Sequence, residues 1–199
     1  MTIMKNFKTL TAVLVMALIA GTSTSFAQDK MMKDKKMKEK TVMVGGAEMY
    51  PTKNIVENAV NSKDHTTLVA AVKAAGLVET LQGDGPFTVF APTNKAFDKL
   101  PEGTVATLLK PENKKKLQTV LTYHVVAGDM KAADIVKAIK KGNGTATFKT
   151  VSGGKLTAMM KGKKVMLKDE NGGMATVSIA NVNQSNGVIH VIDSVVLPK

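Results

Sequence analysis

The spacing of apolar residues changes near Thr145, and this change constrains the fold more than any other feature of the chain. Before Thr145, apolar residues recur at helical spacing, as in Leu68, Val69 and Val72. After it, apolar and polar residues alternate in short runs separated by glycine- and asparagine-rich turns. A period of about 3.6 residues is typical of amphipathic helices, and alternation is typical of half-buried strands. Helices followed by consecutive hairpins predict an α+β domain without alternating βαβ units.

The same patterns set the expected bounds of the individual elements. We predict helices over residues 54–60, 68–75, 77–81, 95–100, 104–109, 111–123 and 129–139. We predict strands over residues 87–91, 145–150, 155–160, 163–168, 175–180 and 187–197. Gly76 directly follows one predicted helix, where a glycine in the left-handed conformation commonly caps the C-terminus.

Composition narrows the classes of site that the chain can contain. The 199 residues are 44% hydrophobic and include no cysteine, which excludes a disulfide framework, a thiolate metal site and a cysteine nucleophile. The net charge is +12, and lysine takes the place of arginine throughout. Because arginine is the side chain suited to bidentate phosphate and base-edge contacts, we expect no sequence-specific nucleic-acid binding. A lysine-rich surface still attracts anions in a salt-sensitive way.

The N-terminal segment has the pattern of an export signal. Lys5 and Lys8 precede an apolar run over residues 10–20, and Ser25-Phe26-Ala27 has the small-x-small form of a cleavage site. The run is shorter than the ~20 apolar residues of a membrane-spanning helix. We therefore predict a signal peptide over residues 1–27, no transmembrane span after its removal, and an extracytoplasmic location, either periplasmic or secreted.

A lysine- and methionine-rich segment follows the predicted signal peptide. We predict that residues 28–49 form a flexible tail and lead-in, and that a folded domain covers residues 50–198. Five methionines crowd the N-terminal part of the mature chain: Met31, Met32, Met37, Met43 and Met49. Because thioethers bind Cu(I), a periplasmic metal-handling role is an alternative to a flexible, oxidisable tail without a ligand.

Three segments together resemble the conserved motifs of the FAS1 (fasciclin-like) domain family. Residues 87–97 (FTVFAPTNKAF) resemble the first family box, and residues 186–198 (NGVIHVIDSVVLP) resemble the second. Between them, Tyr123 and His124 resemble the family's Tyr-His motif. The lead-in is also similar to that of small bacterial secreted members with a single domain. The resemblance covers about residues 50–198.

This resemblance implies both a fold and a role. The implied fold is a wedge-shaped β-sandwich with helices packed at its N-terminal side. The implied role is cell adhesion, or binding to the cell surface or the extracellular matrix, without catalysis. Some members bind integrins around the Tyr-His motif, so Tyr123 and His124 are candidate binding residues.

The motif residues also have a structural interpretation. His124 shares a helical face with Leu117, Val120 and Leu121, which favours a buried histidine, and Asn94 is its hypothetical hydrogen-bond partner. We interpret Thr93 and Asn94 as side chains that satisfy free backbone groups at a turn.

The other two histidines receive different interpretations. His190 lies in a strand that is apolar on both faces, so we expect it in the core. His65 follows Asp64 just before a helix, so we expect it to be exposed.

Clustered lysines form the remaining candidate surface. We predict that Lys114, Lys115 and Lys116 lie together at the start of one helix. Further groups end another helix (Lys137, Lys140, Lys141) or line a hairpin (Lys161, Lys163, Lys164, Lys168). These lysines form either an ordinary solvated surface or a site for an anionic polysaccharide, lipid headgroups or an acidic protein.

Motifs for catalysis and for metal or cofactor binding do not emerge from the sequence. His190, Asp193 and Ser194 have the residue types of a hydrolase triad, but a strand places His190 and Asp193 on opposite faces. The three histidines are too dispersed for a zinc site. The run from Asp169 to Gly173 lacks the spacing of a calcium loop. We therefore expect no catalytic residue, metal or cofactor, and an unrecognised hydrolase stands as the alternative.

Overall fold

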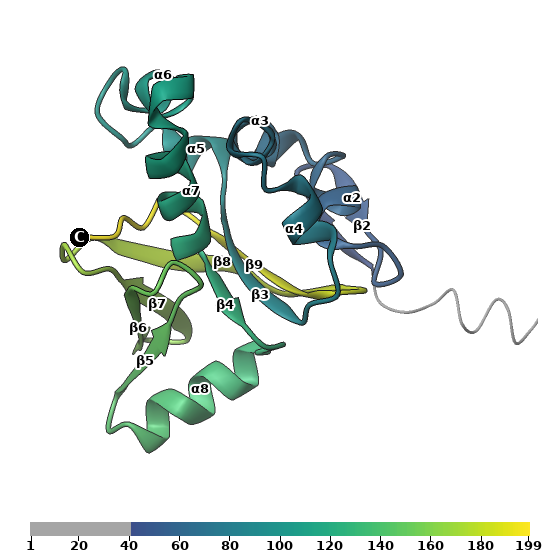
Figure 1. The fold of residues 1–199 in the computed structure, drawn as a ribbon. Helices are drawn as coiled ribbons and strands as arrows, with labels where there is room; N and C mark the ends of the chain where they lie inside the picture. The colour runs from purple at the N-terminus through teal and green to yellow at the C-terminus, as the bar shows by residue number, and fades with distance from the viewer. Residues whose placement is uncertain (1–40) are drawn as a thin grey trace, which may run out of the picture. The chain divides into compact units, whose positions relative to one another are not determined.

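The computed structural model describes residues 41–199 (Figure 1). The predicted signal peptide lies outside the described residues. Residues 28–40 of the predicted tail, with Met31, Met32 and Met37, also lie outside them. Within residues 41–199, no helix is long and apolar enough to cross a membrane.

Helices dominate the first part of the described chain, and strands dominate the last part. The helices are α2 (Ile55–Ala59), α3 (Thr66–Ala75), α4 (Val78–Gln82), α5 (Asn94–Phe97), α6 (Thr104–Leu108), α7 (Lys114–Tyr123) and α8 (Ala132–Lys141), with short 3₁₀ turns η1 (Lys63–His65) and η2 (Pro111–Asn113). The strands are β1 (Val42–Val44), β2 (Ala47–Met49), β3 (Phe87–Pro92), β4 (Val125–Ala127), β5 (Thr145–Lys149), β6 (Lys155–Lys161), β7 (Lys164–Lys168), β8 (Met174–Gln184) and β9 (Gly187–Ile192).

Seven strands form one mixed sheet in the order β4-β3-β9-β8-β7-β6-β5. The strands β3 and β9 pair in parallel, from Phe87 opposite Gly187 to Pro92 opposite Ile192. All other neighbours in this sheet are antiparallel. The two motif segments thus meet side by side, although about 100 residues separate them along the chain.

The long strand β8 connects the two halves of the sheet. Its pairing with β9 shifts register twice, between Val177 and Ile179 and between Ile179 and Val182. Such irregularities bend a strand, so β8 can contribute to both halves. Side chains from both halves then share one hydrophobic cluster, which includes Phe90 of β3 and Leu156 of β6. This arrangement confirms the predicted α+β class, in which helices pack on a large mixed sheet.

Two groups of helices cover the sheet. Helices α3 and α7 pack together through Ala71, Val72, Leu117 and Leu121, and their cluster includes partly buried side chains of α4 and α6. Helix α8 packs instead on β5 and β6 through Ile135 and Ile139 (Figure 1). As predicted, Gly76 ends α3 in the left-handed conformation, with φ of +69°.

Several bounds differ from those predicted. Residues 42–49 form the β1–β2 hairpin, and Val44 and Met49 are buried ahead of residue 50, where we expected the domain to begin. Strand β9 ends at Ile192 instead of 197, because the last residues bind to the loop around Asp169 instead of to a strand. Strand β8 extends four residues further than predicted, to Gln184, since its bulges interrupt the simple alternation.

Candidate functional site

Tyr123 is fully buried at the end of α7. Its hydroxyl donates a 2.6 Å hydrogen bond to the carbonyl of Lys155 and accepts a bond of 3.3 Å from the backbone N–H of Glu170. Burial raises the pKa of this phenol to about 12. The ring also packs against Gly154, where an added Cβ would lie 2.7 Å from Cε2. Tyr123 therefore joins α7 to the start of β6 and to the loop after β7.

His124 is also buried, and both of its ring nitrogens are paired. Nδ1 lies 2.8 Å from the carbonyl oxygen of Val120, and Nε2 accepts a 3.2 Å hydrogen bond from the backbone N–H of Val196. These partners place the proton on Nδ1, since a carbonyl accepts and an N–H donates. Burial lowers the pKa of His124 to about 4, so the ring is neutral at pH 7.

The Tyr-His pair therefore offers no free polar atom to a partner in this structure, and its binding role stays a prediction. The hypothesis that Asn94 pairs with His124 is wrong. Asn94 Oδ1 instead accepts from the N–H of Thr67 and the hydroxyl of Thr66, and its Nδ2 donates to the carbonyl of Lys63. The side chain of Asn94 thus satisfies free backbone groups at the start of α3.

The other motif residues make structural contacts. Thr93 caps α5, since its hydroxyl accepts from the N–H of Ala96. His190 is fully buried, with Nε2 2.9 Å from the carbonyl of Met130 and Nδ1 accepting from the N–H of Asn181 at 3.4 Å. Its ring stacks on Phe90 at a centroid distance of 5.6 Å. Because both ring nitrogens of His190 bond to backbone groups, His190 forms no hydrogen bond to Ser194.

Asp193 and Ser194 belong to a local hydrogen-bond network that does not include His190. Asp193 Oδ1 accepts from the backbone N–H of Thr176 at 2.7 Å and from the hydroxyl of Ser194 at 3.2 Å. Lys99 donates to the Ser194 hydroxyl at 3.1 Å. Within residues 41–199 the triad combination is therefore not assembled, and no group of three acidic or histidine side chains is placed to hold a metal.

His65 contradicts the prediction that it is exposed: only 3% of its surface is accessible. The neighbouring Asp64, just before a helix, suggested an exposed position, but Leu68, Val69 and Val72 follow His65 at i+3, i+4 and i+7. That spacing puts the histidine on the apolar face that α3 turns to the core. The same spacing correctly placed His124 and was a signal for His65 that our interpretation did not use.

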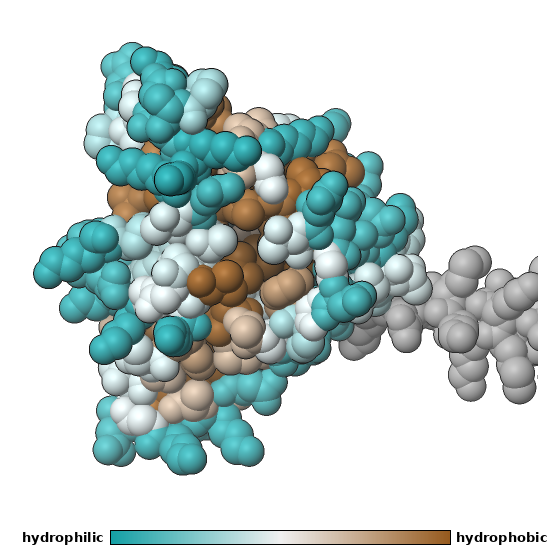
Figure 2. Space-filling view, in the orientation of Figure 1, coloured by the Kyte–Doolittle hydropathy of each residue, from teal (hydrophilic) through white to brown (hydrophobic). Residues whose placement is uncertain are grey.

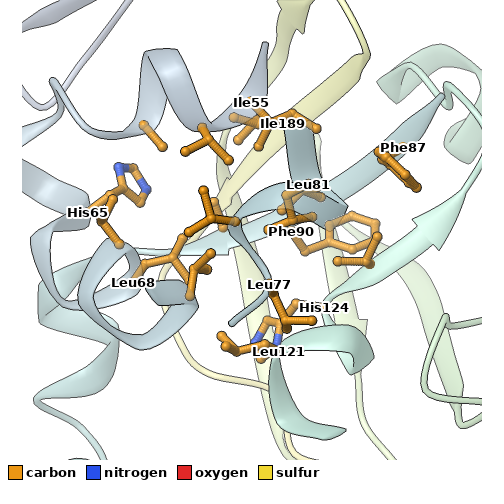
Figure 3. Close-up of a pocket in the computed structure, with 18 of the residues that line it drawn as sticks. Ile55, His65, Leu68, Leu77, Leu81, Phe87, Phe90, Leu121, His124 and Ile189 are labelled. Carbon is orange, nitrogen blue, oxygen red and sulfur yellow. The ribbon is translucent and has the colours of Figure 1, made fainter. Parts of the chain in front are cut away.

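His65 lines an apolar cavity of about 90 Å³ between the helices and the β3–β9 pair. Side chains from α2, α3, α4, α7, β3 and β9 form its wall, and His65 and His124 lie at different sides of it (Figure 3). Its exposed lining residues, Lys73, Thr80 and Val151, mark the opening. Figure 2 shows the apolar residues gathered in a hollow between α7 and the α3–α4 region. No sequence motif predicted this cavity.

The lysines form the second candidate surface. Within residues 41–199, only the pair Lys131–Asp129 forms a salt bridge, at 2.8 Å. Lys114, Lys115 and Lys116 are exposed on the first turn of α7, as predicted.

A larger charge asymmetry lies in residues 135–168, which contain nine lysines and no acidic residue. This segment comprises most of α8 and the strands β5, β6 and β7, which pack together. Lys161 and Lys164 pair across the β6–β7 turn, next to Lys163. Lys140 and Lys141 end α8 just before β5, whose first residue pairs with Met159 near the same turn. We call Lys140, Lys141, Lys161, Lys163 and Lys164 the hairpin-end lysines.

Comparison with known proteins agrees with the motifs. A family model described as "Fasciclin domain" matches residues 63–198. The chain is 44% identical over 189 residues to "Protein sll1483" of Synechocystis, covering 94% of this chain and 98% of that protein. It is 35% identical over 145 residues to "Cell surface glycolipoprotein MPB83" of Mycobacterium bovis, covering 70% of this chain and 58% of that one.

A solved structure shows the same fold. The FAS1 domain pair of the insect cell adhesion molecule Fasciclin I matches with a TM-score of 0.66 and 18% identity, over 74% of this chain and 52% of that one. At this identity the match shows the fold alone. Taken with the family match over most of the folded part and with the close relative in Synechocystis, it shows that this chain belongs to the fasciclin (FAS1) domain family.

Proposed function

We propose that this chain is an exported, non-catalytic adhesion module that binds an anionic polymer at the cell surface through the hairpin-end lysines. The observation that carries the proposal is the segment 135–168, in which nine lysines occur without an acidic residue. Exposed charges of one sign, concentrated on one part of a surface, attract polyanions over a distance of about 10 Å at moderate salt.

The buried polar groups support a binding role over a catalytic one. The motif histidines His124 and His190 both use their ring nitrogens to hold backbone groups. Burial lowers the pKa of each ring, so neither is poised as an exposed general acid or base. The relative MPB83 carries a cell-surface name, which agrees with an extracytoplasmic location for this family member.

Two triple variants with the same loss of charge test the location of the binding surface. We would measure binding of the purified protein to immobilised alginate, an anionic polysaccharide, at about 50 mM and 300 mM salt. K161Q/K163Q/K164Q removes part of the hairpin-end lysines, and K114Q/K115Q/K116Q removes the cluster on α7. We expect the first variant to weaken binding by about tenfold or more, the second to weaken it less, and high salt to weaken both.

Three outcomes would contradict this proposal. Equal losses in the two variants would mean that only net charge matters. A larger loss in the α7 variant would move the surface to Lys114, Lys115 and Lys116. Binding that survives high salt unchanged would exclude an electrostatic surface.

Vesicles with and without anionic lipid, tested in parallel, distinguish a polysaccharide from a membrane as the polyanion.

A further inference from the structure

We propose that an acidic polysaccharide binds along strands β5 and β6, on the face of the sheet that points away from the hydrophobic core. This inference rests on the proposed function, since it takes the ligand to be a polyanion. It extends the binding surface well beyond the hairpin-end lysines, and it selects a polysaccharide over a membrane or a nucleic acid.

Strands β6 and β7 have one face in the core and one face toward solvent. Leu156, Ala158, Val165 and Leu167 are buried in the cluster that also contains Ile135 of α8. Because successive side chains of a strand point to opposite faces, the residues between these four lie on the other face. Helix α8 packs on β5 and β6 through the buried cluster, so it does not cover that other face. We call it the outer sheet face and include the residues of β5 that pair with it.

The outer sheet face has a pair of lysines at each end of β6. Lys161 lies opposite Lys164 at the end where the hairpin-end lysines are, and Lys155 lies opposite Lys149 at the other end. A fifth lysine, Lys168, lies between them in β7, and all five are exposed. Lys155 and Lys161 are the first and last residues of β6, which places them about 20 Å apart along an extended strand.

These two lysine pairs are unfavourable for the free protein. Like charges directly opposite each other destabilise a pair of antiparallel strands. An anion that lies between the two ammonium groups of a pair removes this repulsion in addition to its own attraction. A ligand with repeated negative charges can do so at both ends of β6 at once, whereas a single small anion cannot. The spacing of the pairs therefore favours a polymer.

The carboxylates that follow β7 do not neutralise this face. Asp169 accepts from three backbone N–H groups, and Glu170 accepts from the backbone N–H groups of Lys155 and Lys199. Within residues 41–199, neither carboxylate forms a salt bridge with a lysine of the outer sheet face. The exposed ammonium groups thus remain available to a ligand.

Between the two lysine pairs, the outer sheet face is neutral and rich in hydroxyl groups. Thr147 and Thr157 lie opposite each other, with their hydroxyl oxygens 3.3 Å apart. A hydroxyl donates one hydrogen bond and accepts two, so this pair keeps free capacity for a ligand. Met159 and Met166 form the next row and are half-buried. Hydroxyls beside low apolar groups suit a sugar ring, which has hydroxyls at its edge and C–H groups on its faces.

Two other classes of polyanion fit this face less well. Single-stranded nucleic acids bind on aromatic side chains that stack with the bases. The aromatic residue of these strands, Phe148, packs against the core instead. Binding in a membrane interface uses large apolar side chains such as leucine. Leu156 and Leu167 are fully buried, so the outer sheet face has no leucine to insert.

The length of the ligand tests whether one chain reaches both lysine pairs. We would measure the binding of an alginate disaccharide, which is too short to span about 20 Å, and of an octasaccharide, which is long enough. K149Q/K155Q should weaken octasaccharide binding by about three- to tenfold and disaccharide binding by at most about twofold, because only the longer chain uses both pairs. K115Q/K116Q, with the same loss of charge on α7, should change neither by more than about twofold.

A second double variant tests the hydroxyl groups. T147V/T157V keeps the shape of both side chains and suits a strand, but it removes both hydroxyls. We expect octasaccharide binding to weaken by about three- to tenfold, also at high salt, and binding to vesicles of anionic lipid to stay unchanged. A purely electrostatic surface would not respond to this change. The urea midpoint of each variant shows whether it is folded.

The outcomes separate this inference from the proposed function. If the octasaccharide binds the wild type and both double variants equally well, the outer sheet face is overturned and the proposed function stands. If neither alginate nor the octasaccharide binds at about 50 mM salt, both fall. Equal weakening of the disaccharide and the octasaccharide by K149Q/K155Q would show that no chain spans the two pairs. Tighter binding to anionic vesicles than to the octasaccharide, at equal charge, would overturn the choice of a polysaccharide.

Discussion

The backbone N–H of Val196 donates a 3.2 Å hydrogen bond to Nε2 of His124 and so ties the end of α7 to the C-terminal segment. Both residues are buried. The segment after β9 has no strand pairing of its own, so side chains hold it instead. His124 binds Val196, and Asp169 accepts from the N–H of Leu197 at 2.9 Å. The Tyr-His motif thus contributes to the fold through its histidine.

Replacing His124 with alanine should destabilise the protein before it affects binding. The variant leaves the Val196 N–H without an acceptor and opens a cavity in a buried site. We expect a loss of about 2–4 kcal/mol in the free energy of unfolding, measured by urea denaturation. Alginate binding per folded molecule should stay the same. A fully stable variant that no longer binds would instead assign His124 to the binding surface.

The two tyrosines of the chain provide a matched pair. Tyr123→Phe removes a buried hydroxyl that bonds to the carbonyl of Lys155 and the N–H of Glu170. We expect a loss of about 1–3 kcal/mol in the free energy of unfolding, because the Lys155 carbonyl and the Glu170 N–H both lose a partner. Tyr50→Phe removes a hydroxyl that is bonded to Glu48 in an exposed position, so its urea midpoint should match that of the wild type. Similar midpoints for the two variants would contradict the structural role of Tyr123.

Stability should fall in mild acid because the buried histidines are neutral. Burial lowers the pKa of His124 to about 4, below the ordinary value of 6.5, and it also lowers the pKa of His65 and His190. At a pH between the lowered pKa of a buried histidine and 6.5, the unfolded chain binds more protons than the folded one. The stability gained from keeping the histidines neutral is therefore complete above about pH 6.5 and is lost as the pH falls toward 4. For His124 alone, the loss in the free energy of unfolding is roughly 3 kcal/mol.

Urea denaturation between pH 7.5 and 4.5 measures this dependence. The variant His124→Gln should have a flatter slope of unfolding free energy against pH, since one of the three histidines no longer titrates. A slope identical to that of the wild type would show that His124 is protonated at its ordinary pKa in the folded protein.

Gly187 should be intolerant of any side chain. An added Cβ would lie 2.0 Å from the carbonyl oxygen of Phe87, on the neighbouring strand that pairs in parallel with β9. We expect Gly187→Ala to cost about 3 kcal/mol or more, because two backbones must separate. Gly162→Ala is the control: its φ of +60° is strained for alanine, but nothing lies within 4 Å of the added Cβ. It should cost about 1 kcal/mol, and circular dichroism melts would compare the two.

Local patterns determined much of this protein. The change of period near Thr145 predicted the order of helices and hairpins, and Gly76 predicted the end of α3. The spacing of Leu117, Val120 and Leu121 placed His124 in the core. These features depend on neighbours within about two helical turns, so they can be predicted from one sequence. The two boxes and the Tyr-His motif identified the family for the same reason, because each is a short contiguous segment.

The tertiary structure decided which distant segments meet. Parallel pairing of β3 with β9 brings residues about 100 positions apart into contact, and the bulges of β8 let one strand contribute to both halves of the sheet. The partner of His124 is therefore Val196, not Asn94, since only the path of the whole chain brings the C-terminal segment to α7. The cavity arises in the same way, from helices and strands that each contribute one or two side chains. Its wall exists only after those elements pack.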